Sequence, residues 1–110
     1  MKQKLIMNLL LAMGLLLAFT GASQAEGEGD AVAAKDKLSM CEGCHGIPGY
    51  RTAFPSAYNV PKLGGQHEEY LVKALEAYKN GTRNHPTMNG LAKTLSQQDF
   101  KDFAAYYSKN

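Results

Sequence analysis

The chain has 110 residues, of which 45% are hydrophobic and 20% charged, and its formal net charge is +2 at pH 7. Lys2 and Lys4 account for this excess, because without them ten basic residues face ten acidic ones. A charge-balanced chain lacks the basic face or tail that binding to nucleic acid or to an anionic membrane requires. We therefore expect neither as a partner.

The first 25 residues differ in composition from the rest of the chain. Lys2 and Lys4 precede a largely apolar run, 5–19, and small residues lie just before Ala25. This is the pattern of a secretory signal peptide that is cut after Ala25. An uncleaved anchor is the alternative, but a membrane-spanning helix needs about 20 apolar residues. We expect residues 1–25 to be removed, and residues 26–110 to form a single domain in the periplasm without membrane insertion.

The first helix of this domain is predicted over 30–40. Asp30 can cap its N-terminus, because a carboxylate there accepts hydrogen bonds from free backbone N–H groups. One stripe at helical spacing carries Ala31, Ala34, Leu38 and Cys41. The first cysteine of the chain therefore lies at the end of a helix.

A long loop is predicted over 46–65, because three prolines and several glycines interrupt any period. Loops of this length are uncommon unless they are functional, and wrapping a cofactor would explain this one. Its aromatic residues cover a cofactor edge or fill the core, and we expect Phe54 in the core.

The clearest helix is predicted over 66–80. Two glutamates lie in its first turn, Gly81 follows its end, and one face is apolar. That face consists of Tyr70, Leu71, Ala74, Leu75 and Tyr78. A second loop follows over 82–88, then a short helix over 89–94 and a closing helix that begins at a Ser96 to Asp99 capping pattern. No alternating strand pattern is present, so the domain is predicted to be all-α.

Cys41, Cys44 and His45 form a Cys-x-x-Cys-His motif, the attachment signal for c-type haem. The two thiols reach the vinyl groups on one edge of the porphyrin, and the next residue places its imidazole under the iron. A thioredoxin-like redox pair would need a strand context, and a zinc site would need His67 and His85 at a spacing unlike a ligand pair. A simple disulfide is the third alternative. We expect one covalent haem with its iron.

The sixth iron ligand must come from far along the chain. Without the signal peptide only two methionines remain, and Met40 is tethered beside Cys41 on the side of His45. Met88, in the loop after Pro86, can reach the opposite face. His85 and His67 are the alternatives. The predicted iron ligands are therefore His45 and Met88, and the predicted cofactor-binding residues are Cys41, Cys44, His45 and Met88.

With these residues in place, the chain resembles the class I c-type cytochromes, in particular the single-haem periplasmic kind called cytochrome c-553 or one half of cytochrome c4. The likeness rests on the attachment motif, on 61–66 leading into Tyr70, on 86–88 and on 95–107. It implies a cytochrome c fold of three to five helices around one haem, in which the first and last helices cross and Met88 is the sixth ligand. It also implies that a loop proline carbonyl accepts a hydrogen bond from His45, and Pro48, Pro55 and Pro61 are all candidates.

These features predict an electron carrier rather than an enzyme. Two protein ligands leave the iron no vacant site, and a small, weak interface is typical of redox encounters. The expected partners are an exported or membrane-bound dehydrogenase and a terminal oxidase or reductase, which the protein meets as a monomer. Lys62, Lys73 and Lys79 are candidate docking residues. The alternatives are a permanent haem subunit of a larger oxidoreductase, and an open-site haem enzyme or gas sensor.

Overall fold

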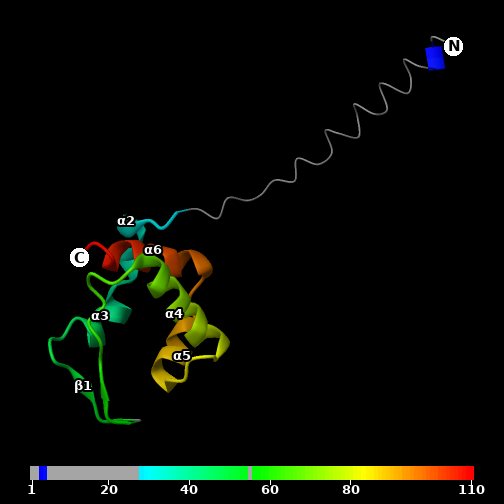
Figure 1. Cartoon of the computed structure of the whole chain (residues 1–110). Coiled ribbons are helices and arrows are strands. Elements are labelled where there is room, and N and C mark those ends of the chain that lie inside the picture. The colour runs from blue at the N-terminus through cyan, green and yellow to red at the C-terminus, as the bar shows by residue number, and fades with distance from the viewer. Residues whose placement is uncertain (1–2, 5–27, 55) are drawn as a thin grey trace.

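A computed structural model of the chain describes residues 3–4, 28–54 and 56–110 (Figure 1). Apart from 3–4, the predicted signal peptide lies outside the described residues, as does its cleavage after Ala25. The helical elements are α2 (Ala31–Ala34), the 3-10 turn η2 (Lys35–Lys37), α3 (Ser39–His45), α4 (Glu68–Asn80), α5 (Pro86–Lys93) and α6 (Gln97–Tyr107). None of them has the length and apolar character that crossing a bilayer requires.

The first helical run, from α2 through η2 to α3, begins where the sequence predicts. The Asp30 carboxylate accepts hydrogen bonds from the N–H groups of Val32 and Ala33, at 2.8 and 3.2 Å. The prediction that helix ends at residue 40 is wrong, because α3 continues through the paired cysteines to His45. Cys41 and Cys44 therefore lie one helical turn apart.

The closing helix α6 starts at the predicted capping box. The Ser96 hydroxyl accepts a hydrogen bond from the Asp99 N–H, and the Asp99 carboxylate accepts one from the Ser96 N–H. Asp99 also pairs with Lys37 of η2. Burial raises the pKa of Asp99, but the hydrogen bonds from Lys37 and Ser96 outweigh it, and the pKa lies below its ordinary value. The cap thus also links α6 to the first helical run.

The core lies where α6 crosses this first run, as the predicted fold requires. Its buried residues are Ala34, Leu38, Cys41, Ala92, Leu95, Phe100 and Phe103. The Asp102 carboxylate, which is also buried, accepts a hydrogen bond from the Asp30 N–H at 2.8 Å. A Cβ on Gly29 would lie 2.1 Å from the Lys101 carbonyl oxygen, so only glycine permits this close approach.

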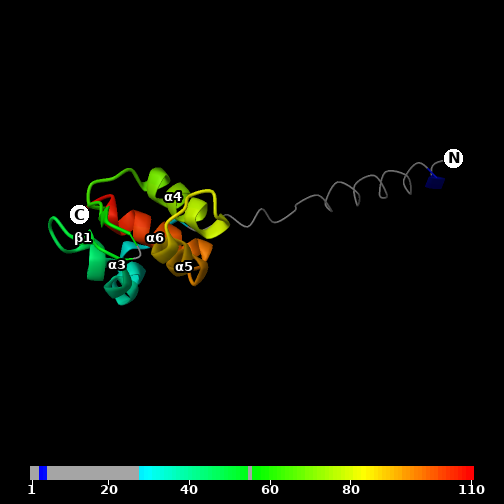
Figure 2. The same cartoon turned by 90° about the horizontal axis from the view of Figure 1, so that it is seen from below.

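α4 and α5 pack against each other, with α3 on the other side of the molecule (Figures 1 and 2). α4 ends at Gly81, whose φ of 85° is the left-handed conformation that glycine adopts most readily. The prediction that the next helix starts at residue 89 is wrong, because α5 starts at Pro86 with His85 as its N-cap. Proline fits the first helical position since it needs no N–H partner there. Met88 therefore lies in a helical first turn rather than in a loop.

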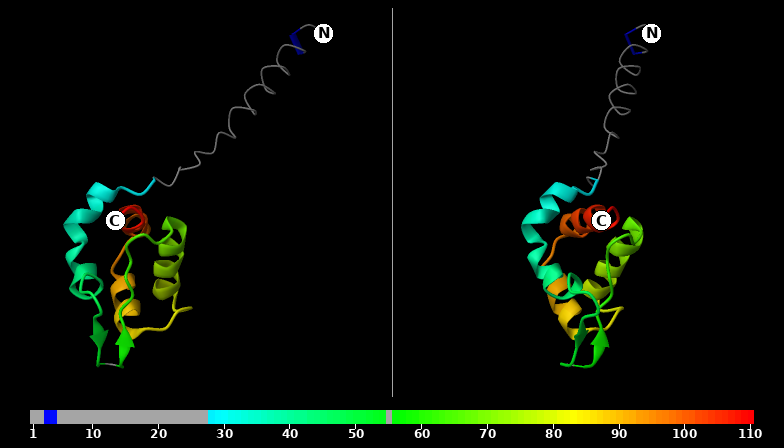
Figure 3. Two further views of the ribbon diagram at one scale, coloured as in Figure 1. Left: turned by 60° about the vertical axis from the view of Figure 1, so that its left-hand side comes forward. Right: turned by 90° about the vertical axis from the view of Figure 1, so that its left-hand side faces the viewer.

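The long connection contains a short β-ladder that the sequence did not predict. Strands β1 (Arg51–Thr52) and β2 (Tyr58–Asn59) pair antiparallel, with Arg51 opposite Asn59 and Thr52 opposite Tyr58. This hairpin extends beyond the helices (Figure 3). Phe54 lies near its tip and is 88% exposed, so the prediction that it fills the core is wrong.

Candidate functional site

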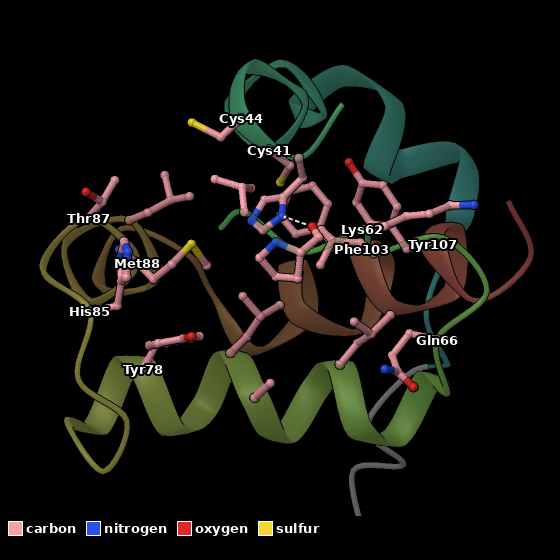
Figure 4. A pocket seen from close by; sticks show the side chains of 18 of the residues that line it. Cys41, Cys44, Lys62, Gln66, Tyr78, His85, Thr87, Met88, Phe103 and Tyr107 are labelled. Atoms are coloured by element: carbon pink, nitrogen blue, oxygen red, sulfur yellow. Dashed lines mark hydrogen bonds between the residues drawn. The ribbon is translucent and has the colours of Figure 1, made fainter. Parts of the chain in front are cut away.

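One cavity of about 340 Å³ lies between the attachment motif and α4 (Figure 4). Its wall is formed by the end of α3, by residues 58–63, and by residues of α4, α5 and α6. Figure 4 shows the two cysteines on one side of the cavity and Tyr78 of α4 on the opposite side. A volume of this size lies within the range of small-molecule and cofactor sites.

The cavity wall explains the apolar face of α4. All five residues predicted to form that face line the cavity, namely Tyr70, Leu71, Ala74, Leu75 and Tyr78. Leu71 is the one buried residue among them, and Tyr70 is 50% exposed. Leu75 and Tyr78 pack partly against the core, while the cavity leaves the rest of this apolar face without a protein neighbour. A large flat apolar ligand would cover it.

The two cysteines are free thiols at the edge of the cavity. Cys41 is 8% exposed and Cys44 is half-buried. Burial, with a further contribution from the Glu42 carboxylate, raises the pKa of Cys41 to about 11, so its thiol is neutral at physiological pH. The Tyr107 hydroxyl also lines the cavity, is buried, and interacts with the Cys41 thiol. Burial raises its pKa above the ordinary value as well.

The imidazole of His45 is held in one orientation. Its Nδ1 lies 2.7 Å from the carbonyl oxygen of Pro61. A carbonyl oxygen only accepts hydrogen bonds, so Nδ1 carries the hydrogen and Nε2 keeps its lone pair for a ligand bond. The expected proline partner is therefore Pro61 and not Pro48, and Pro55 lies outside the described residues. Such a partner fixes the orientation of the ring.

Met88 projects from α5 into the same cavity (Figure 4). Of the two alternative histidines, His67 precedes α4, is exposed and does not line the cavity. His85 does line it, but its Nδ1 accepts a hydrogen bond from the Met88 N–H, at 3.3 Å. The structure thus brings Cys41, Cys44, His45 and Met88 around one cavity.

Of the three candidate docking lysines, Lys62 lines the cavity and the other two make contacts elsewhere. Lys79 donates to the Leu95 carbonyl and lies 5.5 Å from the centre of the Phe100 ring, so it has a structural role. Lys73 pairs with Glu69 on the surface of α4. The cation that sequence reasoning missed is Arg83. Its guanidinium lies 4.7 Å from the centre of the Tyr78 ring, in the cavity wall.

These residues fit a porphyrin and do not fit the alternatives. The fit rests on two free thiols one turn apart, an imidazole with a free Nε2, a thioether, and an apolar wall. In the described part of the chain no three His, Cys, Asp or Glu side chains gather as a metal site, which argues against zinc. The paired cysteines lie on a helix that follows another helix, not after a strand as in thioredoxin-like proteins. The site is therefore that of a c-type cytochrome.

Comparison with known proteins supports this class. The chain is 43% identical over 105 residues to cytochrome c4 of Pseudomonas aeruginosa, a match that covers 96% of this chain and 47% of that protein. It is 42% identical over 83 residues to cytochrome c-554(548) of Halomonas halodenitrificans, which covers 73% of this chain and 95% of that protein. The crystal structure of reduced recombinant cytochrome c4 from Pseudomonas stutzeri superimposes with a TM-score of 0.59 and 40% identity. That match covers 73% of this chain and 45% of the other.

The chain belongs to the class I c-type cytochromes, the family that includes cytochrome c4 and cytochrome c-554(548). No protein-family model matches it. The chain spans about half the length of the curated cytochromes c4 that it matches. The predicted fold class is confirmed, as is the predicted cofactor, covalently bound haem c with its iron. The names of these relatives indicate an electron-transfer protein rather than an enzyme.

Proposed function

We propose that the mature chain, residues 26–110, is a periplasmic single-haem electron carrier. It passes single electrons from an exported or membrane-bound dehydrogenase to a terminal oxidase or reductase. The observation that carries this proposal is the pair of groups that line one cavity, the oriented imidazole of His45 and the thioether of Met88. Haem iron supplies one-electron chemistry, and two strong protein ligands keep its coordination unchanged between the two oxidation states.

Each site residue has one role in this proposal. The thiols of Cys41 and Cys44 would hold the haem covalently, each sulfur bonding to one carbon of a vinyl group while its hydrogen goes to the other carbon. His45 would bind the iron through Nε2 while Pro61 holds the ring. Met88 would supply the sixth ligand and so exclude oxygen, peroxide and carbon monoxide from the iron.

The likeness to a relative supports the carrier role. A protein of Thiomonas intermedia, named as the electron acceptor of thiosulfate dehydrogenase, is 36% identical over 109 residues of this chain. An exported dehydrogenase that oxidises an inorganic sulfur compound is therefore one class of electron donor to test. Docking at the exposed side of the attachment motif is supported by Met40 and Ile47, which flank the motif and are both exposed. Small apolar contacts of this kind suit a weak, short-lived redox interface.

The deciding experiment is a redox titration with optical spectra, on wild type and Met88→Ala made in a host that matures c-type cytochromes. We expect wild type to show the weak far-red band of a thioether bound to iron(III), and not to bind carbon monoxide in the reduced state. Met88→Ala should lose the band, bind carbon monoxide and have a lower midpoint potential, because methionine ligation raises the potential of haem. Identical spectra for the two proteins would remove Met88 from the site.

A second candidate function is a haem subunit of a larger oxidoreductase. The cytochrome subunit of sulfide dehydrogenase from Chlorobaculum tepidum is 31% identical over 101 residues, and the match covers 87% of that protein. The two functions differ in one observable. A carrier purifies alone at its monomer mass from its native periplasm, whereas a subunit co-purifies in stoichiometric amount with a flavin- or metal-containing partner.

A further inference from the structure

The segment that carries Met88 is held by the side chain of Asn89. Its Oδ1 accepts a hydrogen bond from the His85 N–H at 2.7 Å. Its Nδ2 donates to two backbone carbonyls, that of Tyr78 at 2.7 Å and that of Arg83 at 2.8 Å. Both amide hydrogens are used, and all three bonds are partly buried. One side chain thus ties the start of α5 to the last turn of α4 and to the loop between them.

His85 contributes the second half of this attachment. It is the N-cap of α5, with the extended backbone that a following proline favours. Its Nδ1 accepts a hydrogen bond from the Met88 N–H, and its ring forms a T-shaped pair with the Tyr58 ring of β2, with ring centres 5.0 Å apart. Because Met88 is the third residue of α5, the cap bond acts directly on the backbone of the proposed ligand. His85 therefore holds Met88 instead of competing with it.

We propose that His85 and Asn89 are positioning residues that keep Met88 at the sixth coordination site. The inference rests on the proposed function, in which Met88 is the iron ligand. Neither residue binds the haem iron in this account. They fix the first turn of α5, so that the thioether reaches into the cavity from a backbone that is already ordered. No loop has to become ordered when the thioether binds. A ligand held in this way spends little time away from the iron, because detachment leaves the backbone in place.

Two measurements distinguish a positioning role of His85 and Asn89 from a purely structural one. Loss of any buried hydrogen bond lowers the melting temperature. Only loss of positioning raises the fraction of molecules whose sixth site is open, and that fraction sets the apparent affinity of an external ligand. Imidazole is a suitable probe, since it binds iron(III) haem when the methionine leaves. The readout is therefore the apparent dissociation constant of imidazole for the oxidised holoprotein, together with the far-red thioether band.

Four variants separate the possibilities. Asn89→Ala removes the amide contacts, and His85→Ala removes the cap. His85→Asn keeps a side chain that caps helices well but is no histidine. Asn84→Ala is the matched control, because Asn84 lies in the loop between α4 and α5 and is exposed. Its side chain forms no hydrogen bond with another described residue.

We expect Asn89→Ala and His85→Ala to bind imidazole at least about tenfold more tightly than wild type, while Asn84→Ala and His85→Asn stay within about threefold. Imidazole affinities for both alanine variants equal to that of Asn84→Ala, despite a lower melting temperature, would overturn the proposal. So would His85→Asn behaving like His85→Ala. If Asn89→Ala does not mature, the two His85 variants still decide. Failure of the proposed function is distinct, because wild type itself would then lack the far-red band and match Met88→Ala.

Discussion

Replacing Asp102 by alanine tests how the first helix is joined to the last. The Asp102 carboxylate is 8% exposed and accepts hydrogen bonds from the Asp30 N–H at 2.8 Å and from Gln98 Nε2 at 2.9 Å. Asp30 is in turn the N-cap of α2. Asp102→Ala leaves a partly buried N–H without a partner and removes a charged acceptor, which costs about 2–3 kcal/mol. For a domain of this size, that cost lowers the melting temperature by roughly 10–20 °C.

The assay is thermal unfolding of the oxidised holoprotein, followed by far-ultraviolet circular dichroism at neutral pH. Asp102→Asn keeps an oxygen acceptor for the Asp30 N–H, so it should lose about half as much as the alanine variant. Asp36→Ala is the matched control, since it removes an exposed carboxylate from η2 and should change stability by less than about 0.5 kcal/mol. A melting temperature of Asp102→Ala within about 4 °C of wild type would refute the reasoning, and apolar packing alone would then hold the crossing.

Three further predictions follow from the same structure. Gly29→Ala should lower the melting temperature, because its Cβ would clash with the Lys101 carbonyl. Gly90 lies inside α5, and a Cβ there would meet no atom within 4 Å, so Gly90→Ala should raise the free energy of unfolding by up to about 1 kcal/mol. The pKa of Asp99 is lowered, so its stabilising effect is present above its ordinary pKa and is lost as the pH falls through the lowered value; thermal melts of Asp99→Asn between about pH 5 and pH 2 should lack this loss. The pKa of Tyr107 is raised by burial, so wild type should lose stability as the pH rises above about 10, and denaturant titrations of Tyr107→Phe should show a flatter alkaline limb.

The predictions that succeeded rest on local chemistry. Asp30, Gly81 and the pair Ser96 and Asp99 each satisfy backbone groups within a few residues, so sequence alone identifies them. The attachment motif is equally local, because its spacing is the recognition signal itself. Such features do not depend on how distant segments meet.

The predictions that failed concern the chain around the cofactor. The start of α5 was missed because its cap is a histidine, a residue that seldom caps helices, although Pro86 at the first helical position is a usable signal. The hairpin was missed because a ladder of two residue pairs has no period to detect. An apolar side chain such as that of Phe54 favours the core, but its exposure depends on where the hairpin points. No local pattern encodes that direction. The choice of Pro61 among the prolines likewise depends on tertiary structure.

The burial of Cys41 limits the order in which this protein can be assembled. Its thiol lies in the core formed with α6, where it interacts with the Tyr107 hydroxyl, and at physiological pH it is protonated. The sulfur also lines the cavity, and residues of the C-terminal helix form another part of the same wall. We therefore expect ligation to precede docking of the last helix, which then closes over a bond that is already made.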